Sequence, residues 1–356
     1  MYKLIRPLLF GLSKDPETVH NLALYFLRLG GRHPMPLVLA SLAQTVSPLL
    51  EQKVFNLHFP NPVGLAAGFE KDGHGLLALQ ALGFGFVELG GYTRLPQIGI
   101  PRQRIFRLTK DLALINRMGF PNPGADQAAR DLSRIKNIAI PLGINLAKSK
   151  IIANDAAIED YLYSFSKLYN YGDYFVINVS SPNTPGLRQL QSKEFLGEII
   201  GTIMDYRSKQ PKQKPVLIKT TVDFSLSEID ELLEVCRVHK VDGIVCSNSS
   251  VSREGLKTEI DEAGGLSGRP IAARATAMVR HIHKAMPNLT IIGLGGIFTA
   301  EDAYEKIKAG ASLAQIYTGL IYEGPFVVKN INRGLIKLLG RDGFKNIREA
   351  IGIEAA

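Results

Sequence analysis

Eight short apolar runs, each followed by a helix-like pattern, occupy the chain from residue 63 onward. Each run lasts five or six residues, and the one that begins Tyr174-Phe175-Val176-Ile177 is β-branched and aromatic, which is typical of a buried strand. The runs cover residues 63–67, 85–89, 141–146, 174–179, 215–219, 243–247, 290–294 and 313–317. This alternation predicts an α/β fold in which parallel strands close into a (β/α)8 TIM barrel.

Residues 1–45 follow a different pattern, that of an amphipathic helical pair. Leu4, Leu8 and Leu12 recur at helical spacing, and a second apolar stripe begins after Pro16 and ends at a pair of glycines. Farther on, residues 53–59 alternate with period two. We therefore expect an N-terminal helical extension, then one short strand, in front of the barrel.

The helical extension is basic, with five Lys or Arg against two acids in the first 50 residues. A basic amphipathic helix pair indicates a segment that lies on a membrane surface. The alternative is that its apolar stripes simply pack on the barrel. We expect residues 1–45 to be the membrane-association region and residues 46–356 to be the barrel.

Composition narrows the possible partners only partly. The chain has 356 residues and a net charge of +9, which favours an anionic partner without choosing among nucleic acid, anionic lipid and small molecules. Cys236 and Cys246 make neither a disulfide framework nor a metal cluster, and the seven histidines are scattered, so we expect no metal site. The longest uncharged segment, residues 34–50, is too short and too rich in proline to span a bilayer.

Polar side chains follow the predicted strands, most densely at residues 178–186, which read NVSSPNTPG. The carboxyl ends of barrel strands meet at one mouth, where active sites lie. The alternative for this stretch is a proline-rich turn whose side chains cap their own backbone. Other strands end in Asn145, Lys219 and Ser247. A ring of Asn, Ser, Thr and Lys without a carboxylate pair suits a planar ligand with amide edges and does not suit glycoside hydrolysis.

Glycines after the last two strands predict a phosphate site. Gly295-Gly296 and Thr318-Gly319 leave backbone amides open to an anion at the pair of strands where barrels commonly hold phosphate, and Gly268 adds a further close approach. Tight turns alone are the alternative. If Lys219 or Lys71 is buried, it needs a negative charge nearby, and a reduced flavin provides one. The alternative is that both ammonium groups reach to solvent, which is the commoner case for lysine.

Seven stretches resemble dihydroorotate dehydrogenases. They are AAGFEKDG (66–73), INRMGF (115–120), GINLAKSK (143–150), INVSSPNTPGLRQLQ (177–191), GGLSGRP (264–270), IIGLGGI (291–297) and QIYTGLIYEGP (315–325). The chain is similar to the class 2, membrane-associated, quinone-linked branch, because it has Ser181 where class 1A enzymes carry Cys and because the N-terminal helical extension is present.

The resemblance implies FMN at the barrel mouth. The residues that it assigns to FMN are Ala67, Gly68, Lys71, Gly91, Asn145, Asn178, Lys219, Ser247, Gly268, Gly296, Tyr317 and Thr318. Those that it assigns to the substrate, dihydroorotate, are Lys71, Asn116, Arg117, Met118, Gly119, Phe120, Asn178, Asn183, Asn248 and Ser249. Ser181 is implied as the catalytic base that removes the C5 proton while hydride passes from C6 to flavin N5, giving orotate for pyrimidine (UMP) biosynthesis.

The resemblance also implies a membrane quinone as the electron acceptor. His20, Arg107 and Tyr317 match positions that line a quinone tunnel under the N-terminal helices. No metal and no nucleic-acid partner are implied. The absence of a recognisable transit peptide or spanning segment favours peripheral attachment to the cytoplasmic face of a bacterial inner membrane.

Serine is a poor base in water, so Ser181 needs help within the site. One hypothesis is that Thr184 and a water held by it relay the proton outward. Residues 182–191, bounded by Pro and Gly, are expected to act as a lid over the substrate.

Three other functions remain open from the sequence. A soluble class 1-like enzyme using fumarate or NAD would need Cys at position 181 and no helical extension. A phosphate-binding barrel lyase or isomerase would show a Schiff-base Lys or an acid–base carboxylate and would be colourless. A peripheral membrane module with an inactive barrel would not turn over dihydroorotate.

Overall fold

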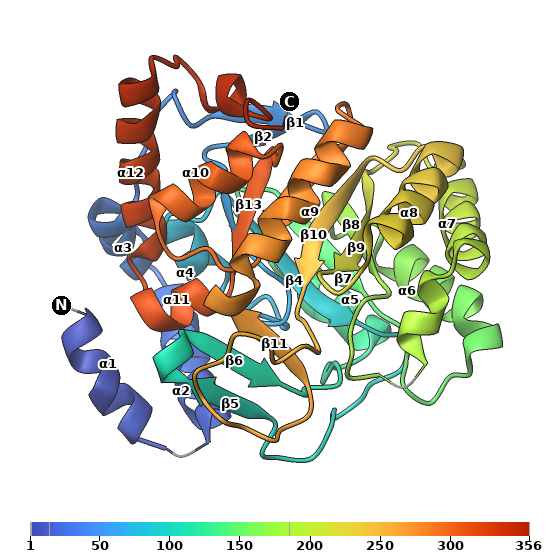
Figure 1. The fold of residues 1–356 in the computed structure, drawn as a ribbon. Coiled ribbons are helices and arrows are strands. Elements are labelled where there is room, and N and C mark those ends of the chain that lie inside the picture. The colour runs from blue at the N-terminus through green and yellow to red at the C-terminus, as the bar shows by residue number, and fades with distance from the viewer. Residues whose placement is uncertain (1, 14, 185, 356) are drawn as a thin grey trace.

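The computed structural model describes residues 2–13, 15–184 and 186–355, and its centre is a closed barrel of eight parallel strands (Figure 1). In order around the barrel the strands are β3 (Val63–Leu65), β4 (Phe86–Tyr92), β7 (Leu142–Leu146), β8 (Tyr174–Asn178), β9 (Val216–Thr221), β10 (Gly243–Asn248), β12 (Thr290–Leu294) and β13 (Leu313–Ile316). All eight predicted strands are confirmed. They are apolar on both faces because side chains fill the barrel on one face and helices cover the other.

Helices surround the barrel on its outer side (Figure 1). They are α4 (Leu76–Ala81), α5 (Ala125–Leu132), α6 (Ala157–Leu168), α7 (Lys193–Ser208), α8 (Leu226–His239), α9 (Ala272–Ala285), α10 (Ala300–Lys308), α11 (Thr318–Glu323) and α12 (Val327–Asp342). Local sequence sets where some begin: a capping box of Ser225 and Glu228 starts α8, and one of Thr299 and Asp302 starts α10.

The predicted N-terminal extension is present as α1 (Tyr2–Gly11), α2 (Pro16–Gly30) and α3 (Met35–Ala43). Asp15 caps α2 by accepting the backbone N–H of Glu17. Helix α1 buries none of its residues, and it is held beside α11 by the Tyr2 hydroxyl, which donates to Ile321 O at 2.8 Å. No helix in the described part of the chain is long and apolar enough to cross a membrane. The division into residues 1–45 and 46–356 stays a prediction.

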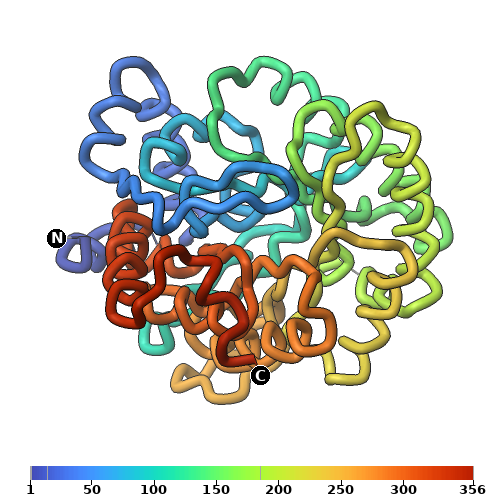
Figure 2. The backbone as a smooth tube through the Cα atoms, turned by 90° about the horizontal axis from the view of Figure 1, so that it is seen from above, coloured from blue at the N-terminus to red at the C-terminus, as the bar shows by residue number. Residues whose placement is uncertain are grey.

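Residues 52–59 form a hairpin, so the prediction of a single strand here was wrong. Strands β1 (Gln52–Val54) and β2 (Leu57–Phe59) pair antiparallel, and Phe55 and Asn56 have positive φ angles of 55° and 60°. Two positive φ angles form a tight hairpin turn that does not interrupt the period-two pattern. The hairpin lies over one end of the barrel (Figure 2). The rings of Phe59 and Phe86 pack edge to face there.

A second small sheet, which the sequence did not reveal, lies at the opposite end of the molecule from the hairpin (Figure 1). Strand β6 (Ala113–Asn116) is central and pairs antiparallel with β5 (Ile105–Leu108) and β11 (Gly265–Gly268). In the register of β6 with β11, Asn116 is opposite Gly265. Two loops that are far apart in sequence are thereby joined beside the carboxyl ends of the barrel strands.

Candidate active site

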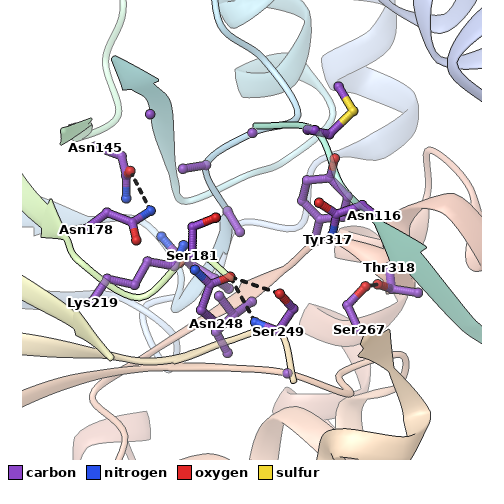
Figure 3. Close-up of a pocket in the computed structure, with 18 of the residues that line it drawn as sticks. Asn116, Asn145, Asn178, Ser181, Lys219, Asn248, Ser249, Ser267, Tyr317 and Thr318 are labelled. Carbon is purple, nitrogen blue, oxygen red and sulfur yellow. Dashed lines mark hydrogen bonds between the residues drawn. The ribbon is translucent and has the colours of Figure 1, made fainter. Parts of the chain in front are cut away.

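The carboxyl ends of the barrel strands surround an open cavity (Figure 3). All twelve residues predicted to contact the cofactor line it, and Ser181 lines it as well. Of the predicted substrate residues, those that line it are Lys71, Asn116, Met118, Gly119, Phe120, Asn178, Asn183, Asn248 and Ser249. The structure therefore brings together side chains that are spread over most of the sequence.

Three predicted residues do not line this cavity. The side chain of Arg117 turns away, since it pairs with Glu262 and lies over the ring of Phe106 at 4.7 Å. His20 and Arg107 lie outside the cavity, on the side of the N-terminal helices.

A carboxylate that was not predicted from the sequence lies behind the residues that line the cavity. Glu88 in β4 is fully buried and accepts hydrogen bonds from Asn145 Nδ2 at 2.8 Å and Gln315 Nε2 at 2.7 Å. Lys219 Nζ lies 3.6 Å from Glu88 Oε1. Glu88 is the one charged residue in the sequence FVELGGY of β4. A lone charge inside a buried apolar strand was the available signal, because such a group needs a partner.

Ser181 is buried at the end of β8, with 5% of its surface exposed, and its Oγ accepts the backbone N–H of Asn183 at 3.2 Å. Asn183 Nδ2 donates to the carbonyl of Asn116 at 3.1 Å, which connects this loop to β6. Asn248 Nδ2 donates to Ser180 Oγ at 3.1 Å. Asn116, Ser181 and Asn248 therefore surround one space.

The loops that follow β12 and β13 contain glycines at positions where the backbone is tightly packed. Gly296 has φ +76°, and a Cβ there would lie 2.3 Å from the Cβ of Ala272. A Cβ on Gly319 would lie 2.1 Å from Ile297 O. Only glycine allows this close approach of backbone to backbone. Thr318 and Ser267 hydroxyls meet at 2.9 Å beside these loops. Both hydroxyls line the cavity on this side.

Lys71 lies in a loop whose backbone is held by a second buried carboxylate, that of Glu70. Glu70 accepts the backbone N–H groups of residues 71, 72, 73 and 75. Burial, and then the charge of Arg104, lower the pKa of Lys71 to about 8. A lysine ammonium in such surroundings gains from an anionic ligand.

Aromatic rings connect the cavity with the N-terminal helices. His20 of α2 packs edge to face on Phe69 with ring centroids 4.8 Å apart, and Phe69 packs on Tyr317 at 6.0 Å. Burial lowers the pKa of His20 to about 4 and raises that of Tyr317 to about 12, so both are neutral at physiological pH. Arg107 lies over the ring of Phe10 at 4.5 Å and donates to Ser13 O at 2.8 Å.

The two cysteines are buried and separate. Burial raises the pKa of each thiol to about 12, so both stay protonated and unreactive. Cys246 directly precedes Ser247 of the cavity and is a small core residue.

A closed parallel barrel with its polar cavity at the strand carboxyl ends places this chain among the (β/α)8-barrel enzymes. The chain belongs to the dihydroorotate dehydrogenase family: the family model described as "Dihydroorotate dehydrogenase" matches residues 49–339. The resemblance seen in the sequence is thus confirmed, and the chain is an oxidoreductase of that family.

Similar proteins cover nearly the whole chain. "Dihydroorotate dehydrogenase (quinone)" of Gloeobacter violaceus is 46% identical over 99% of this chain and 98% of its own. The protein of the same name from Thermosynechococcus vestitus is 49% identical over 94% and 95%. The crystal structure of DHODH from Eimeria tenella in complex with ferulenol is similar with a TM-score of 0.88 and 34% identity, covering 98% of each chain.

Proposed function

We propose that this protein oxidises (S)-dihydroorotate to orotate with a membrane quinone as acceptor, through bound FMN, in pyrimidine (UMP) biosynthesis. The observation that carries the proposal is the convergence of Ser181, the Asn side chains and Lys219 on one cavity, in a chain of this family. The names of the quinone-dependent relatives support the choice of acceptor.

The cavity fits FMN in two respects. Gly268, Gly296 and Gly319 line the cavity, and without side chains they allow a phosphate to approach the backbone amides of these loops. On the opposite side, Lys219 and the carboxamides offer a cation, donors and acceptors to a flat polar ring. Gln315 Oε1 is buried beside the cavity and has no hydrogen-bond partner among the described residues, so it is free for a ligand donor.

FMN, when bound, supplies the acceptor for the hydride that leaves C6 of dihydroorotate. The chain itself holds and orients the substrate. Asn116, Asn183 and Asn248 each offer a donor and an acceptor to its amide edges, and the Lys71 ammonium attracts its carboxylate. Arg117 contributes at most through its backbone, since its side chain pairs with Glu262.

Ser181 is the base that takes the proton from C5. Its low exposure keeps bulk water away, which favours proton transfer within the site. Thr184 is buried three residues later, and its Oγ1 has no partner among the described residues, which suits a proton relay through a bound water. The proposed lid, residues 182–191, includes Pro185, which lies outside the described residues.

Electrons leave toward the N-terminal helices. The row His20–Phe69–Tyr317 connects α2 with the cavity, and these rings, all neutral at physiological pH, suit an apolar quinone. Arg107, close to the same helices, offers a donor to a quinone carbonyl. Residues 1–45 thus form the quinone tunnel and the membrane-association region.

Exposed apolar side chains on the extension suit peripheral binding to a membrane. Leu4 is 80% exposed and Leu8 74%, and Phe26 and Leu37 are also exposed on the neighbouring helices. Such a surface favours the boundary between headgroups and acyl chains. The proposed location is the cytoplasmic face of a bacterial inner membrane.

An absorption spectrum tests the proposal. We expect purified protein to carry, or to take up, FMN, and its visible band to bleach when dihydroorotate is added without air. Adding a short-chain quinone should restore the band, while NAD or fumarate should not. A protein that cannot take up FMN would favour the lyase or isomerase alternative. Recovery of the band with fumarate or NAD would favour the class 1-like alternative.

A further inference from the structure

We propose that Glu88 is a positioning residue of this site: its carboxylate fixes the orientation of the carboxamides that face the ligands and balances the charge of Lys219. The inference rests on the proposed function, because it takes FMN and orotate to be the ligands of the cavity.

Glu88 does not itself line the cavity, so any effect that it has on a ligand there passes through its neighbours. It is fully buried in β4, whereas Asn145, Gln315 and Lys219, its three partners, all line the cavity. Its two oxygens are both used, Oε1 by Asn145 and Lys219 and Oε2 by Gln315. An ionised carboxylate can only accept hydrogen bonds, so each neighbouring carboxamide must turn its NH2 group toward it.

From Glu88 a row of hydrogen bonds runs to the substrate side, and all of them point the same way. Asn145 donates to Glu88 at 2.8 Å, and Asn178 donates to Asn145 Oδ1 at 3.0 Å. Ser180 then donates to Asn178 Oδ1 at 3.0 Å, and Asn248 donates to Ser180 Oγ at 3.1 Å. Asn145, Asn178 and Asn248 are labelled in Figure 3. Because each acceptor is fixed by the bond before it, the charge at Glu88 determines which atoms Asn178 and Asn248 have left for a ligand.

The same carboxylate makes Lys219 one half of an ion pair. Lys219 is 4% exposed and lies 3.6 Å from Glu88 Oε1. A buried cation that faces no anion is costly, and a buried pair loses stability when one partner is removed. With Glu88 present, the pair carries no net charge. Without it, the uncompensated Lys219 would favour the more negative, reduced form of a flavin at the cavity.

The main experiment measures the flavin midpoint potential and orotate affinity in Glu88→Gln, Lys219→Met and the double variant. We expect Glu88→Gln to shift the potential upward, Lys219→Met to shift it downward, and the double variant to return toward wild type. Orotate should bind about tenfold more weakly to Glu88→Gln, because the carboxamides of Asn178 and Asn248 are then free to turn. A tenfold loss of affinity corresponds to the loss of about one hydrogen bond. Asp160→Asn, which removes another fully buried carboxylate from α6, should not shift the potential.

A Glu88→Gln protein that binds FMN with unchanged potential and unchanged orotate affinity overturns the inference. Unfolding of the apo-proteins by denaturant gives a second test that needs no flavin. Each single variant should be destabilised, and the double variant should be more stable than Glu88→Gln alone, because it removes both charges together. If the double variant is no more stable, the ion pair does not have the proposed role. Failure of the wild-type protein to take up FMN would count against the proposed function and leave the unfolding test intact.

Discussion

Arg104 and Glu17 form a bidentate ion pair, with Arg104 Nη2 2.7 Å from Glu17 Oε1 and Arg104 Nε 2.9 Å from Glu17 Oε2. The pair joins α2 to the loop before β5, because Arg104 Nη1 also donates to the carbonyls of Ile98 and Ile100 at 2.8 Å. Ile100 N–H in turn donates to Met118 O at the cavity. The helical extension and the substrate side of the barrel are thereby connected through one guanidinium.

Glu17→Gln is expected to lower the free energy of unfolding at pH 7 by about 3 kcal/mol, because it leaves Arg104 buried without its anion. The hydrogen bond to Arg104 lowers the pKa of Glu17 below the ordinary 4.5. The stabilisation is therefore complete above pH 4.5 and is lost as the pH falls through the folded-state pKa. Denaturant titrations at pH 7 and at acidic pH measure this. Glu254→Gln at the exposed surface is the control, and an equal loss at both pH values would contradict the prediction.

Ser181→Ala is expected to slow flavin reduction by dihydroorotate by roughly 10²- to 10⁴-fold, the usual contribution of a general base. FMN and orotate should still bind, since the hydroxyl is a small part of the cavity. Stopped-flow absorbance under anaerobic conditions measures the rate. Ser181→Cys is the informative companion, because a thiol base should restore part of the rate with a different pH profile. Normal reduction by the Ala variant would remove Ser181 from the mechanism.

Thr184→Val should slow the same step about tenfold and alter its pH profile, because the relay loses its hydroxyl while the buried volume is kept. Thr184→Ser keeps the hydroxyl and should behave like wild type. The comparison separates a relay from a packing role, since packing would be disturbed more by Ser than by Val. An unchanged rate and pH profile in the Val variant would end the relay hypothesis.

Substrate affinity should weaken above about pH 8, where Lys71 loses its proton. The sign follows from the lowered pKa: below it the ammonium is present to attract the substrate carboxylate, and above it the amine is neutral. The KM for dihydroorotate as a function of pH measures this. Lys71→Arg, which stays charged, should show no such rise in KM over the range from about pH 8 to about pH 10.

Leu4→Glu combined with Leu8→Glu should weaken binding to anionic vesicles by at least tenfold, since each exposed leucine contributes about 1.5–3 kcal/mol when buried in lipid. Co-sedimentation with vesicles measures the loss. Leu226→Glu, at a 60% exposed position on α8, is the matched control and should bind normally. Flavin reduction should be unaffected in both variants. Equal vesicle binding by the double variant would show that α1 does not contact the membrane.

The barrel could be predicted from the sequence because its signal is local. Each buried strand is a short apolar run, and eight of them leave few other folds. The residues at the strand ends, such as Asn145 and Asn178, could be predicted for the same reason: parallel strands bring their ends to one place. That these residues lie together around the cavity follows from the parallel strands alone and does not depend on which distant segments pair outside the barrel.

Features that depend on distant pairing could not be predicted. The β5–β6–β11 sheet joins segments about 150 residues apart, and β11 is the glycine-rich run GLSG, which has little strand propensity. The direction of Arg117 depends on Glu262, which is equally distant in sequence. Glu88 lies within its strand rather than at the strand's carboxyl end, so its position does not mark it as a residue of the cavity mouth.

The antiparallel pairing of β6 with β11 also has a consequence for the order in which parts of the protein can fold during synthesis. When the chain has been synthesised as far as β10, β6 can already pair with β5 but still lacks β11, because Gly265 has not yet been added. The barrel itself is open at that moment, since β12 and β13 come later still. Contacts over such long stretches form slowly, so the part of the cavity beside β6 and β11 is completed only near the end of synthesis.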